Sequence, residues 1–140
     1  MTGKVFIDSN VLVYAHDLDA GSKQAQAAAW LKRLWNAALG RLSTQVLQEF
    51  YVNVTRKIKR PLDPGQAREV VRSYSLWVES FLTPGTVIRA SEISEAWQLS
   101  FWDGMIVAAA EQDGASELLS EGFVHGRVIA GVRVRNPFQG

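Results

Sequence analysis

Near its start the chain reads Val5-Phe6-Ile7-Asp8-Ser9-Asn10. A short apolar run followed directly by polar residues is typical of a buried strand whose carboxyl end opens into a helix. Ser9 or Asn10 is the expected N-cap of a helix over 11–16. Sites in open parallel sheets gather at the carboxyl ends of the strands, so Asp8 is the first candidate site residue. An Asp at this place also serves as an ordinary helix cap, and that interpretation stays open.

Strand-like and helical segments alternate along the rest of the chain. This alternation predicts an α/β sandwich with a mainly parallel sheet that is covered on both faces. Repeats, linkers and Gly/Ser tracts are missing, so residues 1–140 are expected to form a single domain. The expected strands are 5–7, 41–43, 78–82, 117–120 and, at an edge of the sheet, 132–134. The expected helices after the first are 22–38, 44–59, 63 to about 76, 83–98 and 102–112.

Composition excludes several classes of protein. A hydrophobic content of 47% with five Trp is incompatible with a disordered chain. The sequence has no Cys, which excludes disulfides, thiolate zinc sites and cysteine nucleophiles. The absence of a long apolar run and of a signal-peptide pattern predicts a cytoplasmic protein without a membrane partner. With a net charge of +1, binding to a nucleic acid requires a local basic patch.

Four acidic residues stand at places where an ordinary surface charge is not expected. Asp8 is the first. Glu49 interrupts an apolar helix and shares a polar stripe with Gln45 and Asn53; such stripes are usually solvated, but this one lacks Lys and Arg. Asp103 opens an apolar helix, where the helix dipole alone also favours a carboxylate. Glu121 follows the next-to-last expected strand and has the alternative of being a plain loop acid.

Acids brought together repel one another, so a cluster of them requires a cation. Oxygen-only sites suit hard divalent ions, and Mg²⁺ or Mn²⁺ is therefore the expected cofactor. The lack of Cys and the presence of only two His argue against Zn²⁺. Such a cluster is suited to phosphoryl chemistry on a phosphodiester.

The sequence resembles the PIN-domain family, and within it most closely the VapC-type toxins of bacterial toxin–antitoxin pairs. The resemblance spans nearly the whole chain in the family's order, through VFIDSNVLVY at 5–14, STQVLQEFY at 43–51, LSFWD at 99–103 and RNPF at 135–138. It implies a three-layer α/β/α sandwich and an endoribonuclease that depends on Mg²⁺ or Mn²⁺. RNA is the implied substrate, and a cognate antitoxin and a second copy of the chain are the implied partners.

The resemblance also implies roles for individual residues. Asp8, Glu49 and Asp103 would hold the metal ion. Asn10 would hydrogen-bond Asp8 or a metal-bound water, and Ser120 would orient a carboxylate.

One position departs from the family's pattern. The late motif of the family reads Ser-Glu-Asp and then a hydrophobic residue, whereas this chain has Ser120-Glu121-Gly122-Phe123. Three consequences stay open: Glu121 replaces the missing carboxylate, the site works with three acids, or catalysis is weakened or lost. The last would leave a silent PIN-like binding protein. A phosphotransferase with an aspartyl nucleophile is a further alternative, but it needs a second Asp where the chain has Asn10.

Basic and aromatic residues indicate possible binding surfaces for RNA and an antitoxin, but less specifically than the acids indicate a metal site. The densest basic run comprises Arg56, Lys57, Lys59 and Arg60. It either contacts RNA phosphates or complements the dipole at a helix C-terminus. A looser group comprises Arg127, Arg133 and Arg135. Trp30 and Trp35 are either core residues or anchors for the helix of an antitoxin.

Overall fold

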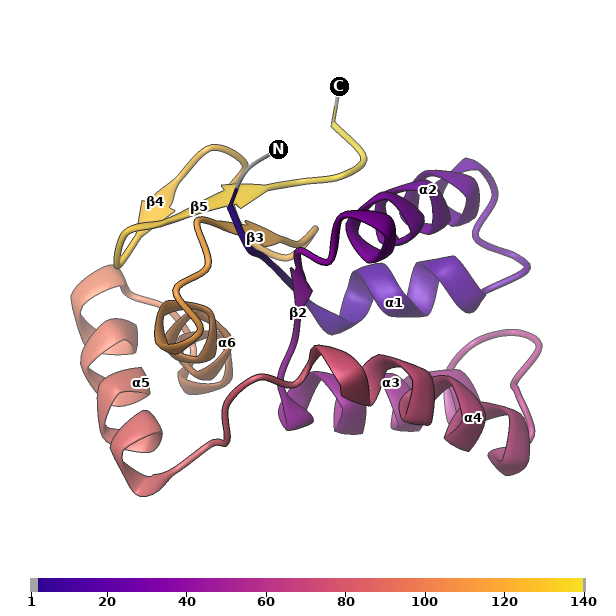
Figure 1. The fold of residues 1–140 in the computed structure, drawn as a ribbon, viewed down its shortest axis with the longest axis horizontal. Helices are drawn as coiled ribbons and strands as arrows, with labels where there is room; N and C mark the ends of the chain where they lie inside the picture. Colours follow the sequence, from indigo (N-terminus) through magenta and orange to yellow (C-terminus); the bar gives the residue numbers. More distant parts are fainter. Residues whose placement is uncertain (1–2, 140) are drawn as a thin grey trace.

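A five-stranded sheet in the order β2-β1-β3-β5-β4 forms the centre of the protein (Figure 1). The structure is a computed structural model and describes residues 3–139. Three strands run parallel in the middle of the sheet and a fourth pairs parallel with β1, while the fifth is antiparallel to β5. In chain order they are β1 (Val5–Ile7), β2 (Gly40–Arg41), β3 (Glu117–Leu119), β4 (Val128–Ile129) and β5 (Val132–Arg135).

Six α-helices surround this sheet. They are α1 (Ser9–His16), α2 (Ser22–Ala37), α3 (Thr44–Arg56), α4 (Pro64–Tyr74), α5 (Pro84–Trp97) and α6 (Phe101–Gln112), with a 3-10 turn η1 (Ser75–Trp77) after α4. The connection from β1 to β2 and the connection from β2 to β3 cross the sheet in opposite directions. Right-handed crossovers therefore place α1–α2 and α3–α6 on opposite faces. The expected α/β fold with a mainly parallel central sheet is confirmed.

The core lies where the helices meet the strands. Phe6 and Leu118 on neighbouring strands are fully buried, as is Phe50 of α3. Residues 104–110 of α6 are buried throughout, which explains why this helix is apolar on all sides. Within residues 3–139, no helix is both long enough and apolar enough to cross a membrane.

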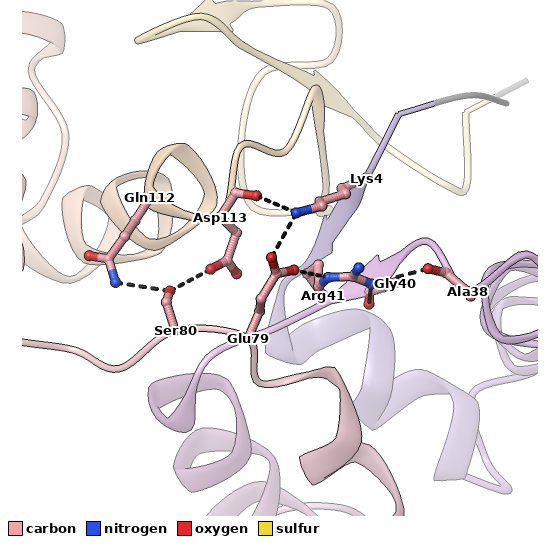
Figure 2. Close-up of polar contacts among 8 residues, drawn as sticks. All are labelled: Lys4, Ala38, Gly40, Arg41, Glu79, Ser80, Gln112 and Asp113. Atoms are coloured by element: carbon pink, nitrogen blue, oxygen red, sulfur yellow. Dashed lines mark hydrogen bonds and ion pairs between the residues drawn. The ribbon is translucent and has the colours of Figure 1, made fainter.

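The strand expected at Val78–Leu82 is wrong. Only Val78 pairs with the sheet, through a single parallel bridge to Leu42, and the segment then continues as a loop. Side chains hold this loop in place of a ladder of backbone hydrogen bonds. Glu79 forms ion pairs with Lys4 (2.7 Å) and Arg41. Figure 2 shows a second attachment of the loop, in which Ser80 hydrogen-bonds Asp113 (2.5 Å) and Gln112 (2.9 Å).

The sequence had indicated that the last strand lies at an edge of the sheet, and this expectation is wrong. It is β5, which lies between β3 and β4; the missed two-residue β4 is the edge strand. Gly131 at φ +82° provides the tight reversal between β4 and β5, a conformation that glycine adopts without strain.

The ends of several elements also differ from expectation. Helix α1 begins at Ser9 and its N-cap is Asp8. The strand expected at 41–43 is instead β2, at Gly40–Arg41. Helix α3 ends at Arg56, because the backbone N–H groups of Lys57 and Ile58 both turn to the carbonyl of Asn53 ahead of Pro61.

A close approach of α6 to α5 sets the position of the α6 N-terminus. A Cβ atom on Gly104 would lie 2.5 Å from the backbone carbonyl oxygen of Ala90 on α5. Only glycine therefore fits at this contact. Because Gly104 directly follows Asp103, the same contact fixes where the Asp103 carboxylate lies.

We expect Gly104→Ala to lower the free energy of unfolding by about 1–3 kcal/mol, since the added methyl group collides with a backbone carbonyl that has little room to move. Gly85→Ala on α5 is the matched control, because the nearest contact of its Cβ is Thr83 Oγ1 at an ordinary 3.5 Å. That variant is expected to be neutral or up to about 1 kcal/mol more stable, since Ala favours helices. Urea unfolding measures both, and equal effects would contradict the packing argument.

Candidate acidic active site

The carboxyl ends of β1 and β3 bring Asp8 and Ser120 side by side. The backbone N–H of Asp8 donates to the carbonyl of Leu119 (3.0 Å), which continues the pairing of the two strands. Asp8 is only 7% exposed and Ser120 is fully buried. The Asp8 side chain accepts a hydrogen bond from the backbone N–H of Ser9 (2.7 Å). Asp8 is thus both the helix cap that the sequence allowed and a buried acid at the sheet edge.

Hydrogen bonds hold the Asp8 carboxylate in one orientation. Ser120 Oγ donates to Asp8 Oδ2 (2.8 Å), and Asn10 Nδ2 lies 3.4 Å from the same oxygen. Ser120 Oγ in turn accepts from the backbone N–H of Gly122 (3.0 Å). The contacts expected of Asn10 and Ser120 are therefore present around Asp8.

Glu49 reaches the same region from α3. Ser9 Oγ donates to Glu49 Oε1 (3.1 Å), so α1 and α3 meet at this carboxylate. Gln45, one turn earlier, is buried; its Nε2 lies 3.5 Å from Glu49 Oε2 and 3.3 Å from the carbonyl oxygen of Trp102. Among the described residues, Gln45 Oε1 is one of two buried side-chain atoms without a hydrogen-bond partner. The sequence had indicated Ser9 only as a possible helix cap and not as a partner of Glu49.

Asp103 lies in the first turn of α6. Its backbone N–H donates to the N-cap Ser100 (3.1 Å), and burial raises the pKa of its carboxyl. The neighbouring Trp102 is 64% exposed, so a large aromatic ring stands in solvent next to this acid. The backbone of Trp102 is also the point at which Gln45 links α3 to α6.

The three acids form one electrostatic cluster around Asp8. Burial raises the pKa of Asp8 to about 6, and the hydrogen bonds from Ser120 and Ser9 only partly offset this. The negative charges of Glu49 and Asp103 raise it further. None of the groups with the largest effect on the pKa of Asp8 is a cation. A buried carboxylate that meets two further acids and no Lys or Arg is an uncompensated negative site.

The donor set suits a hard divalent cation, although it is not a closed cage. Within residues 3–139 no three His, Asp or Glu side chains are arranged to hold one ion directly. Mutual repulsion keeps carboxylates apart unless a cation draws them together. Mg²⁺ commonly keeps several waters and uses one or two protein carboxylates, which fits the spread of these acids. The unpartnered Oε1 of Gln45 beside Glu49 adds an acceptor that a water molecule could satisfy.

Glu121 is held outside this cluster. Its carboxylate accepts from the Tyr14 hydroxyl (2.6 Å) and from Lys23 Nζ (2.5 Å). Its charge is not among those that raise the pKa of Asp8. The backbone N–H of Glu121 donates to Asn10 Oδ1 (3.2 Å), so this residue supports the site through its main chain.

The basic run at 56–60 divides into residues with different surroundings. Lys57 lines a cavity of about 400 Å³ together with Ser9 and Glu49, which places a cation beside the acidic cluster. Arg60 instead forms an ion pair with Asp19 (3.1 Å). The remaining two members, Arg56 and Lys59, are exposed.

Comparison with known proteins gives one family match and several structures of similar fold. The family profile of the PIN domain matches residues 5–127. Curated protein sequences give no significant match. A toxin–antitoxin complex from Klebsiella pneumoniae superposes with a TM-score of 0.68 at 18% identity, over 97% of this chain and 99% of the other. The Mycobacterium tuberculosis toxin VapC20, described as cleaving the sarcin–ricin loop, gives a TM-score of 0.60 at 18% identity over 86% and 97%. FitAcB from Neisseria gonorrhoeae gives 0.61 at 17% identity over 96% and 98%.

The raised pKa of Asp8 predicts an unusual effect of Asp8→Asn on stability. A pKa of about 6 in the folded state against an ordinary 3.8 means that the folded protein binds this proton more tightly than the unfolded chain. The stability that the neutral carboxyl contributes is therefore full below about pH 4 and is lost as the pH rises past 6. Without divalent ions, we expect Asp8→Asn to exceed the wild type by about 2–3 kcal/mol at pH 8 and to match it near pH 4.

Urea unfolding in EDTA at the two pH values measures this difference. Asp63→Asn is the matched control, since Asp63 is an exposed N-cap of α4. It is expected to show no comparable pH dependence. An Asp8→Asn protein that is less stable than the wild type at pH 8 would contradict the electrostatic account.

Proposed function

Since the chain belongs to the PIN-domain family, we propose that it is an endoribonuclease that uses Mg²⁺ or Mn²⁺. The observation that carries the proposal is the uncompensated negative charge where Asp8, Glu49 and Asp103 meet, because a cation is needed to balance it. These three residues would hold the ion, in part through water molecules that the ion retains. The bound ion would activate water and stabilise charge on the phosphate and on the leaving oxygen.

Other residues of the chain would orient the carboxylates of the site and bind the RNA substrate. Ser120 and Asn10 fix the Asp8 carboxylate, and Ser9 fixes that of Glu49, so the donors are set before RNA arrives. Lys57 in the cavity beside Glu49 supplies positive charge for a phosphate of the substrate. The exposed ring of Trp102 next to Asp103 offers a surface on which an RNA base can stack.

We further propose that the protein is the toxin of a toxin–antitoxin pair. Two of the similar structures are described as a toxin–antitoxin complex and as an RNA-cleaving toxin. A groove of about 580 Å³ between α3 and α4, lined by Leu47, Tyr51 and Val71, is suited to an amphipathic helix of an antitoxin. Gln48 and Val52 line both this groove and the cavity of Glu49, so a bound antitoxin would lie against the acidic site.

We also propose that the protein forms a homodimer.

The two Trp residues considered as anchors for an antitoxin have other contacts. Trp35 packs against Tyr74 and Trp77, and two Arg side chains lie over the ring of Trp30. Neither lines the groove between α3 and α4.

The direct test is cleavage of total RNA with Mg²⁺ or Mn²⁺, followed by mapping of the new ends. Asp8→Asn and Asp103→Asn should each reduce the rate at least about 100-fold while circular dichroism stays unchanged, because each removes a carboxylate that would hold the ion. Asp63→Asn, at the exposed N-cap of α4, is the control and should cleave like the wild type. Full activity in either site variant would disprove the assignment.

Gly122 favours a second candidate, a PIN-like binding protein with weak or no turnover. The residue stands where the family's pattern has an aspartate, and a Cβ atom there would meet only Asn10 Nδ2 at 3.6 Å and Ser120 Oγ at 3.7 Å. The position therefore has room for a side chain beside the residues that fix Asp8.

Gly122→Asp distinguishes the two candidates. The added carboxylate should strengthen Mn²⁺ binding and cleavage by about 10–100-fold, the usual effect of one supporting residue at a metal site. Gly122→Asn is the matched control of equal size without the charge, and it should give no gain. A silent wild type with an active Gly122→Asp variant would favour the second candidate. Equal behaviour of the two variants would show that the missing carboxylate is unimportant.

A further inference from the structure

One face of the sheet is uncovered near its last strands. In β5, Val132 and Val134 are buried, whereas Arg133 and Arg135 are exposed. Alternate residues of a strand point to opposite faces, so the two Arg lie on the face turned away from α6. Figure 1 shows α5 and α6 together on one side of β4 and β5, and the chain after β5 running towards α2.

Between this face and α2 lies a groove of about 490 Å³, which we call the Trp30 groove. Its floor and walls come from Trp30 of α2, from the loop before β4 and from β5 with the segment after it. None of the described residues that line it is acidic, and they include His125, Arg133 and Arg135. The groove is therefore positively charged on a protein whose net charge is only +1.

Two guanidinium groups lie over the ring of Trp30, which lines this groove. Those of Arg33 and Arg135 lie 4.5 and 5.4 Å from the centre of its ring. Arg135 also forms an ion pair with Glu117 (2.6 Å). Among the described residues, neither Arg33 nor Arg133 has an acidic partner within 4 Å, so both are available to an anion.

His125 presents a donor to the same groove. Its Nδ1 accepts from the backbone N–H of Asn136 (2.9 Å). In the neutral ring, the proton then resides on Nε2, and this N–H can donate a hydrogen bond to a phosphate oxygen. The side chain is exposed, so this N–H is free to meet a ligand.

The Trp30 groove adjoins the acidic site at the sheet edge. The carbonyl of Arg135 accepts from the backbone N–H of Ser120 (3.0 Å). Ser120 in turn holds the Asp8 carboxylate. Two hydrogen bonds thus link Arg135 of the groove with Asp8. The groove lies at β5, the neighbour of β3, on the face of the sheet that is turned away from α6.

We infer that the Trp30 groove is a second contact site for single-stranded RNA, which holds phosphates of the strand outside the acidic site. The inference rests on the proposed ribonuclease function and extends it to a second contact for the same substrate. The Arg side chains around Trp30 are suited to contacts with the phosphates of a single strand, while the Trp30 ring itself is covered by two guanidinium groups. A protein partner is disfavoured because the groove is less apolar than the groove between α3 and α4.

The test measures the binding of a fluorescein-labelled 12-nucleotide oligouridine by anisotropy, in EDTA so that cleavage does not interfere. The variant Arg33→Gln/Arg133→Gln removes two charges without disturbing the Arg135–Glu117 pair. Lys32→Gln/Arg68→Gln is the control with the same change of net charge, because both residues are exposed, lie outside the Trp30 groove and form no ion pair within the described part of the chain. We expect the first variant to weaken binding about tenfold at 0.1 M salt and to lower the slope of log K against log salt by about 1.4, as two lost phosphate contacts require. The control should bind like the wild type.

Each other outcome overturns the inference. Equal weakening in both double variants would show that RNA senses only the net charge. Unchanged binding in the Arg33/Arg133 variant, or absence of binding by the wild type, would leave the groove without this ligand. Cleavage by the wild type is measured separately with Mn²⁺, so failure of the ribonuclease proposal is distinguishable: groove-dependent binding without cleavage would retain the contact site and reject the enzyme.

Discussion

A buried negative charge with no internal partner governs the architecture of the site. Asp8 lies at the end of a central strand, is almost inaccessible to water and meets the charges of Glu49 and Asp103. Protein interiors rarely keep such a group without a cation, because neither burial nor repulsion is offset. Ser120 and the backbone of Ser9 offset part of the cost and fix the orientation of the carboxylate. The rest of the cost is not offset by these hydrogen bonds, which supports the proposal that a cation binds here.

Several features of the fold position the three acids. Parallel pairing of β1 and β3 places Asp8 beside Ser120, and the crossover through α3 and α6 brings two acids from distant parts of the sequence to the same edge. Gly104 lets α6 pack close to α5 and thereby places the first turn that carries Asp103. Glu121 pairs with Lys23 and accepts a hydrogen bond from Tyr14 instead of joining the acids. The burial of Asp8 thus lowers stability, as is common at active sites, and this supports the proposed role of the residue.

Much of this could be predicted from the sequence, because the strongest signals are local. The apolar run before Asp8 predicts the first strand, and the apolar helix with Asp103 in its first turn is found one residue earlier than expected, at Phe101. The failures concern contacts between distant residues. The segment at 78–82 has the composition of a strand but is tied by Lys4, Arg41 and Asp113, none of which is near it in sequence. Similarly, the two-residue β4 is too short to leave a periodic pattern, and its presence moves β5 away from the edge.

We propose that a divalent ion takes the place of a proton on Asp8. Calorimetric titration of the protein with Mn²⁺, in two buffers of different ionisation enthalpy, measures the protons released for each ion bound. With the pKa of Asp8 at about 6, the account predicts release of about half a proton near pH 6, falling to almost none at pH 8. Binding that releases no proton at either pH, or no binding of Mn²⁺ at all, would contradict it.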